Sequence, residues 1–162
     1  SLGHGLPVCT GMALAGKMNG QDYRVYTVMG DGELAEGSVW EGAMAASHYK
    51  LDNLCAVVDR NRLQISGNTE DVMSQDDLHE RFASFGWYVI DVEDGNDIDQ
   101  LKEAFEKAKT VKGRPSVLIA NTVKGKGSSV MEDQANWHHK VPNEEELAQI
   151  RKDLKERKEA AR

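Results

Sequence analysis

The sequence has 162 residues and a formal net charge of −7 at neutral pH, from 20 basic and 27 acidic side chains. This acidic balance argues against a general nucleic-acid-binding surface, and no apolar run approaches the roughly 20 residues that a membrane span needs. Two cysteines, Cys9 and Cys55, are too few for a disulfide framework. Because no signal peptide is visible either, we expect a cytoplasmic protein that binds neither nucleic acid nor membrane.

Segments rich in β-branched residues alternate along the chain with segments of helical periodicity. Strands are predicted at residues 23–29, 54–58, 87–92 and 116–120, and helices at residues 6–18, 74–84 and 97–110 and from positions 38 and 143 onward. This alternation is typical of an α/β fold in which helices flank a mainly parallel sheet in three layers. The last helix has a narrow apolar stripe, so we expect one domain over residues 1–147 and a peripheral helix over residues 148–162.

A strand–helix–strand unit at residues 23–67 contains the main functional signal. Ser38 is predicted to open its helix, with Glu41 completing a capping box. The two strands should be parallel and joined by a right-handed crossover. Asp31 and Asn61 each follow one of these strands, so both should lie at the sheet edge where parallel folds bind ligands.

The residues at this edge suit a metal-bridged diphosphate. Asp31 offers a carboxylate and Asn61 an amide oxygen, which are ligands that Mg²⁺ prefers. Gly30 and Gly32 would let the backbone approach a phosphate closely.

Other interpretations of these glycine motifs remain open. A dinucleotide fingerprint fits poorly, because the gap from Gly32 to Gly37 is too long and Asp31 would repel a pyrophosphate that has no cation. An ordinary acidic turn is the plainer alternative, although the second ligand at Asn61 disfavours it. The loop TVKGKG at residues 122–127 suggests either a phosphate loop without Walker spacing or a solvated basic loop.

Three separated motifs resemble transketolase, and more narrowly the N-terminal subunit of a two-subunit transketolase. They are GDGELAEGSVWE at residues 30–41, SHYKLDNL at 47–54 and DRNRLQISG at 59–67. The resemblance extends from Ser1 to about Leu147. The sequence starts without Met, and the histidine-containing helical segment that precedes this point in the family is absent, so we expect a piece of a longer chain.

The resemblance implies a thiamine diphosphate-binding fold that serves the transfer of a two-carbon ketol unit from a ketose phosphate to an aldose phosphate. It implies a Mg²⁺ ion, with Ca²⁺ or Mn²⁺ as substitutes, held by Asp31, Asn61 and the backbone carbonyl of Leu63. The cofactor contacts that it implies are Leu2, Gly3, Gly30, Asp31, Gly32, Asn61, Ile65 and His138.

The resemblance also implies catalytic roles for Glu36, Glu41 and His138. The two glutamates would join a network with a partner's catalytic glutamate across a dimer interface, and His138 would touch the diphosphate and the substrate. From the residues alone, the capping box would explain Glu41 without any function. His138 and His139 would point to opposite faces of a strand, which disfavours a shared metal.

The chain has no room for the pyrimidine-binding domain that supplies the activating glutamate in this family. The resemblance therefore implies a partner, the C-terminal transketolase subunit, in a hetero-oligomer or dimer that acts on sugar phosphates. The partner should bury the helix that follows Ser38 and the loop at Glu36. The alternatives are a dihydroxyacetone synthase, a sulfosugar transketolase, or a cofactor-binding module that is non-catalytic in isolation.

Overall fold

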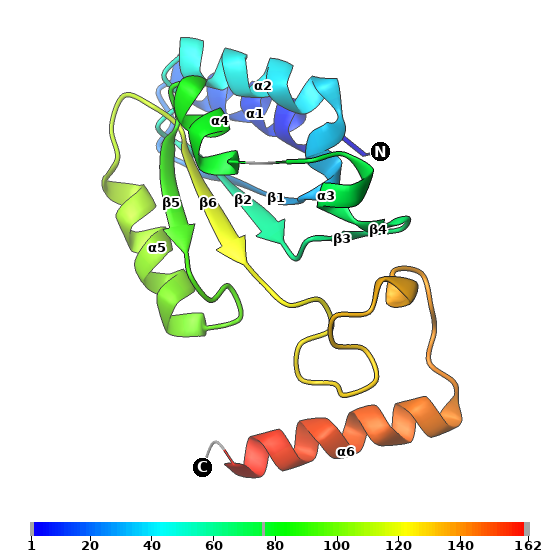
Figure 1. Cartoon of the computed structure of the whole chain (residues 1–162). Coiled ribbons are helices and arrows are strands. Elements are labelled where there is room, and N and C mark those ends of the chain that lie inside the picture. Colours follow the sequence, from blue (N-terminus) through cyan, green and yellow to red (C-terminus); the bar gives the residue numbers. More distant parts are fainter. Residues whose placement is uncertain (1, 76, 161–162) are drawn as a thin grey trace.

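The fold is built on a four-stranded parallel sheet, in a computed structural model that describes residues 2–75 and 77–160. The strands are β1 (Val25–Gly30), β2 (Leu54–Arg60), β5 (Tyr88–Val92) and β6 (Ser116–Asn121). They lie in the order β1-β2-β6-β5, and every neighbouring pair is parallel (Figure 1). The central strands β2 and β6 are nearly continuous apolar runs, as expected for strands that are covered on both faces.

Helices on both faces of the sheet complete three layers. These helices are α1 (Gly5–Met18), α2 (Gly37–His48), α4 (Leu78–Ser84) and α5 (Ile98–Thr110). The first three share a core with strand residues such as Leu54 and Val117. α5 packs against residues of the opposite parity, such as Val57 and Leu118, because side chains alternate between the two faces along a strand. The predicted three-layer α/β fold is confirmed.

These helices leave part of edge strand β1 uncovered, on the face of the sheet that α5 packs against. α5 lies against β5 and β6, and β1 has a strand neighbour on one side only in the described part of the chain. Tyr26 meets the edge of Phe105 with ring centroids 5.8 Å apart and remains 43% exposed, while Val28 is 72% exposed.

The predicted capping box at Ser38 and Glu41 is wrong. α2 begins at Gly37, Glu36 occupies its N-cap position, and no side chain caps the helix there. The Ser38 hydroxyl already lies within the first turn, so it reaches a neighbouring segment and donates to the carbonyl of Gly3 at 2.8 Å. Glu41 is exposed on the outer side of α2.

The single helix predicted at residues 74–84 is wrong in its first part. α4 begins only at Leu78, and Asp77 caps it from a left-handed conformation with a φ of 51°. Asp76 lies outside the described residues. Five short elements not predicted from the sequence complete the fold: η1 (Gly32–Ala35), β3 (Leu63–Gln64), β4 (Gly67–Asn68), α3 (Thr69–Val72) and η2 (Ala135–Trp137).

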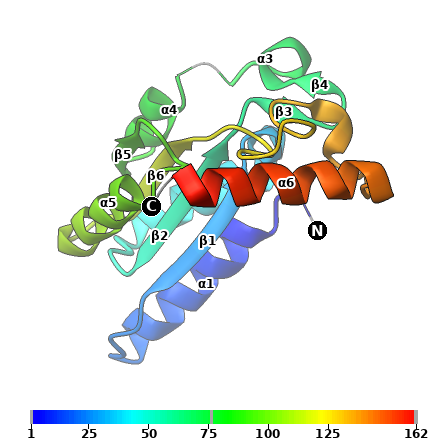
Figure 2. The ribbon, with the colours of Figure 1, turned by 90° about the horizontal axis from the view of Figure 1, so that it is seen from below.

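The last helix, α6 (Glu144–Ala160), lies apart from the three layers, beyond the carboxyl ends of the strands (Figures 1 and 2). It opens with a capping box, in which Asn143 and Glu146 each accept the other's backbone N–H at 2.9 Å. None of its residues is buried. The domain division at residue 147 stays a prediction, and no helix in the described part of the chain is long and apolar enough to span a membrane.

Candidate active site

The carboxyl ends of β1 and β2 bring Asp31 and Asn61 together, as the sequence predicts. The two strands are neighbours, with Gly30 paired to Asp59 in the parallel register. The backbone N–H of Asp31 donates to the Asp59 carbonyl at 3.2 Å, and the Asp31 carboxylate accepts the N–H of Arg62. Asp31 and Asn61 therefore face one cavity from adjacent loops.

This cavity has a volume of about 250 Å³. It is lined by all but one of the predicted cofactor and metal residues: Leu2, Gly30, Asp31, Gly32, Asn61, Leu63, Ile65 and His138. The exception, Gly3, is buried and donates its N–H to Glu33. Small-molecule sites typically measure about 300–1,000 Å³, so the cavity fits a site that encloses only part of its ligand.

Asp31 is a buried carboxyl group, with 2% of its surface exposed. Burial raises its pKa above the ordinary value, and the nearby Asp59 carboxylate acts in the same direction. The backbone N–H groups of Arg62 and Gly32 oppose this rise by hydrogen bonding to the ionised form. The net effect is a carboxylate whose negative charge a bound cation would stabilise.

The oxygen atoms around Asp31 suit a hard cation. The Asn61 amide oxygen accepts the N–H of Leu63 at 3.0 Å, which fixes its orientation at the cavity wall. Among the described residues, no group of three or more His, Cys, Asp or Glu side chains is arranged as a metal site. A cation beside Asp31 would therefore depend on amide, backbone and ligand oxygens as well, which is the usual pattern for Mg²⁺.

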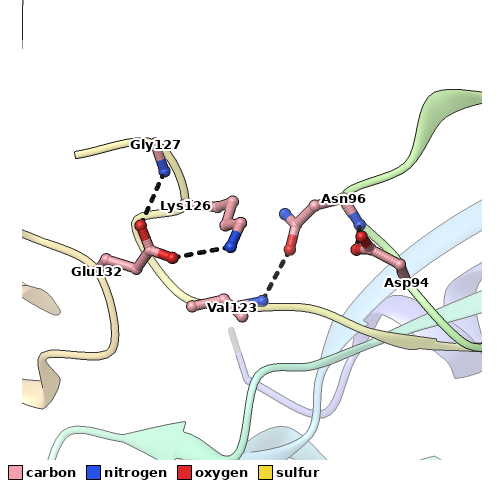
Figure 3. Close-up of polar contacts among 6 residues, drawn as sticks. All are labelled: Asp94, Asn96, Val123, Lys126, Gly127 and Glu132. Carbon is pink, nitrogen blue, oxygen red and sulfur yellow. Dashed lines mark hydrogen bonds and ion pairs between the residues drawn. The ribbon is translucent and has the colours of Figure 1, made fainter. Parts of the chain in front are cut away.

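The loop at residues 122–127 contributes Lys124 to the cavity. From the sequence alone, either of its two lysines could have faced the ligand. The Val123 N–H donates to the Asn96 side chain at 2.9 Å, and Lys126 pairs with Glu132 at 2.8 Å (Figure 3). Lys126 does not line this cavity, and its charge is paired with an acid outside the motif. Lys124 lines the cavity and has no ion pair among the described residues.

His138 lies on the cavity wall directly after η2. The predicted strand geometry is wrong here, because His138 has helical backbone angles and its ring meets that of His139 edge-on, with centroids 4.6 Å apart. Burial lowers the pKa of His138 below its usual value, and the charges of Lys124 and His139 add to this effect. His138 is exposed, and the lowered pKa favours the neutral form of its imidazole.

Glu36 and Glu41 do not line the cavity. Both are exposed on the outer side of the molecule at the start of α2. Glu33, which the sequence analysis does not single out, does line it and holds the backbone of two glycines. Its position directly after Gly30-Asp31-Gly32 is the signal that could have identified it.

Comparisons with known proteins identify the class to which this fold and cavity belong. Residues 1–160 match the family described as transketolase, thiamine diphosphate binding domain. The chain belongs to the transketolase family, and the part that it represents is the domain that binds thiamine diphosphate.

The most similar relatives include proteins described as transketolase subunits. The chain is 48% identical over 157 residues to one of the subunits of the apulose-4-phosphate transketolase of Phocaeicola vulgatus, covering 97% of this chain and 56% of that protein. It is 41% identical over 145 residues to a 6-deoxy-6-sulfo-D-fructose transketolase subunit of Clostridium sp., covering 90% of this chain and 52% of that protein. The chain thus spans about half the length of these relatives.

A solved structure agrees with this assignment. The transketolase of Campylobacter jejuni superimposes with a TM-score of 0.89 at 28% sequence identity, covering 95% of this chain and 25% of that one.

Proposed function

We propose that this chain forms the diphosphate-binding half of a thiamine diphosphate-dependent transketolase, which transfers a two-carbon ketol unit between sugar phosphates. The observation that carries the proposal is the buried Asp31 beside Asn61, in one cavity with Lys124 and His138. A carboxylate that suits a cation, together with a lysine that has no ion pair within residues 2–75 and 77–160, matches a metal-bridged diphosphate.

In this proposal each residue has a definite role. Asp31, Asn61 and the Leu63 carbonyl hold Mg²⁺, for which Ca²⁺ or Mn²⁺ can substitute. Lys124 neutralises diphosphate charge, and the neutral His138 exchanges hydrogen bonds with diphosphate and substrate. When bound, thiamine diphosphate supplies the nucleophilic carbon of ketol transfer, and the protein binds and orients it.

We propose that the complete site needs a partner, a C-terminal transketolase subunit that carries the pyrimidine-binding domain. The small cavity, the outward-facing Glu36 and Glu41, and relatives that are described as subunits support this arrangement. The two glutamates would then meet the partner's catalytic glutamate in a hetero-oligomer or dimer.

The relatives named for apulose 4-phosphate and for 6-deoxy-6-sulfo-D-fructose favour a transketolase of an unusual sugar as the second candidate. We also expect a cytoplasmic location, which the two free thiols of Cys9 and Cys55 support.

Calorimetry and a transfer assay test the proposal. With a candidate C-terminal subunit present, thiamine diphosphate should bind in Mg²⁺ and not in EDTA, and ketol transfer should appear only in this mixture and not with the chain alone. Metal-independent binding would contradict the assignment of the cavity. Transfer by the pure isolated chain would contradict the need for a partner.

A further inference from the structure

The backbone of Gly3 is held from two sides by side chains that follow β1. The Gly3 N–H donates to Glu33 Oε1 at 2.9 Å. The Gly3 carbonyl accepts from the Ser38 hydroxyl at 2.8 Å. Both polar groups of one peptide segment are thus satisfied by a loop distant in sequence, which fixes the position of the turn at residues 2–4.

The space around Gly3 shows how closely the two segments approach. A Cβ atom at Gly3 would lie 2.7 Å from Glu36 Cβ and 2.8 Å from Ser38 Oγ, so no side chain fits there without a shift. Gly3 also has a φ of 77°, which disfavours any residue with a side chain.

Glu33 also links this turn to the carboxyl end of β1. Its second oxygen accepts the N–H of Gly30, the last residue of β1, at 3.3 Å. An ionised carboxylate can accept several N–H bonds, and such charge-assisted bonds are stronger than neutral ones. One side chain therefore sets the distance between the turn at Gly3 and the loop that carries Asp31.

The residue that this arrangement places at the cavity is Leu2. Leu2 lines the cavity and is 61% exposed, so its place on the wall depends on the peptide that follows it. Because Gly3 is held at both its N–H and its carbonyl, it fixes the position of Leu2 in the cavity that Asn61 and Ile65 also line.

We propose that Glu33 and Ser38 are positioning residues that clamp Gly3, so that Leu2 forms one wall of the cofactor cavity. They act through backbone hydrogen bonds and not by contact with reacting atoms. The inference rests on the proposed function, because it takes the occupant of the cavity to be thiamine diphosphate.

The test compares Glu33→Ala, Glu33→Gln and Ser38→Ala with the unaltered chain. Amide hydrogen exchange at residues 2–4 should accelerate in Glu33→Ala while β2 and β6 stay protected. The Kd of thiamine diphosphate, measured with Mg²⁺ and the candidate C-terminal subunit, should rise about tenfold. Glu33→Gln keeps one acceptor oxygen, so its exchange rate and its Kd should lie between those of the unaltered chain and those of Glu33→Ala. Ser38→Ala breaks the clamp from the other side and tests it even if Glu33→Ala fails to fold.

A matched control is Glu106→Gln, which removes an exposed carboxylate paired with Lys109 on α5. It should change neither measurement. If the unaltered chain does not bind thiamine diphosphate even with the candidate C-terminal subunit present, the proposed function is at fault, and the exchange data still test the clamp. If that chain binds the cofactor and the variants bind it equally well, the positioning role is overturned, whether or not exchange at residues 2–4 has changed.

Discussion

Asp31 combines burial with negative charge, and no ion pair among the described residues involves it. Because its pKa is raised above the ordinary value of 3.8, ionisation costs folding free energy as pH rises from there toward the folded-state pKa. Near neutral pH the metal-free chain therefore bears this cost, which a bound cation would relieve. Buried groups with such perturbed pKa values gather at functional sites.

The first prediction is that Asp31→Ala weakens the metal-dependent binding of the cofactor. Thiamine diphosphate affinity in Mg²⁺ should weaken at least tenfold, or about 1.4 kcal/mol, because the carboxylate ligand of the cavity is lost. Calorimetry with the partner present measures this effect, and thermal melting of the same sample checks that the variant is folded. An unchanged affinity would refute the metal assignment.

A second prediction concerns the charge of Lys124. Replacing it in Lys124→Met should raise the pKa of His138, because the lysine charge contributes to the lowered value. Titration of the imidazole C2 proton by NMR measures the change. Lys126→Met is the matched control, since Lys126 pairs with Glu132 and should leave the His138 titration unchanged.

The sequence predicts Asp31 and Asn61 correctly as neighbours because parallel topology alone places them at one edge. It does not decide between Lys124 and Lys126, because the acid that pairs with Lys126 lies outside the loop motif. It also cannot show that Gly3 is gripped by Glu33 and Ser38, since that contact depends on tertiary packing.

At the scale of elements, the apolar strands and the amphipathic helix α5 follow from periodicity and are predicted to within one or two residues. Helix starts are less predictable, because a serine followed by a glutamate three positions later matches a capping box whether or not the helix begins there. That pattern misassigns Ser38, whereas Asn143 and Glu146 form the box as the chain enters α6. The two-residue strands β3 and β4 are too short to show any periodicity.

The third prediction is that acid releases α6 before the sheet unfolds. Lys140 holds the pKa of Glu146 below its ordinary value, and Ser129 does the same for Asp153. Groups with lowered pKa values stabilise the fold above their ordinary values and lose this contribution as pH falls through the folded-state values. Backbone chemical shifts of α6 should therefore move toward coil between about pH 5 and about pH 3, ahead of those of β2.

The control for this acid effect is Asp153→Asn, which weakens the contact with Ser129 at every pH. The α6 helix of this variant should already be loosened at neutral pH. Its chemical shifts should therefore change less than those of the unaltered chain when the pH is lowered. An α6 that keeps its shifts at about pH 3 would contradict the role of these carboxylates.

At the scale of the whole molecule, α1 and α2 present an apolar outer surface. Val8 and Met12 on α1 and Met44 on α2 are all more than half exposed. A helix that is apolar on every side is normally buried. Met44 follows the exposed Glu41 by three residues on α2, and we propose above that Glu41 meets the partner subunit.

The fourth prediction is that Met12→Glu blocks assembly with the partner subunit. A charge placed in an apolar interface is desolvated without compensation, so affinity for the C-terminal subunit should fall tenfold or more. Light scattering of the mixture measures the assembly. Met73→Glu alters an equally exposed methionine away from α1 and α2 and should assemble normally, and equal behaviour of the two variants would exclude this surface.

The open side of β1 has a consequence for the chain in solution. An edge strand with apolar Tyr26 and Val28 beside it offers backbone groups to which another extended segment can add. Proteins usually protect such edges with charged residues, proline or a bulge, and the strand sequence VYTVMG contains neither a charge nor a proline. Without its partner, the chain should therefore aggregate as its concentration rises. This aggregation would compete with binding to the partner subunit.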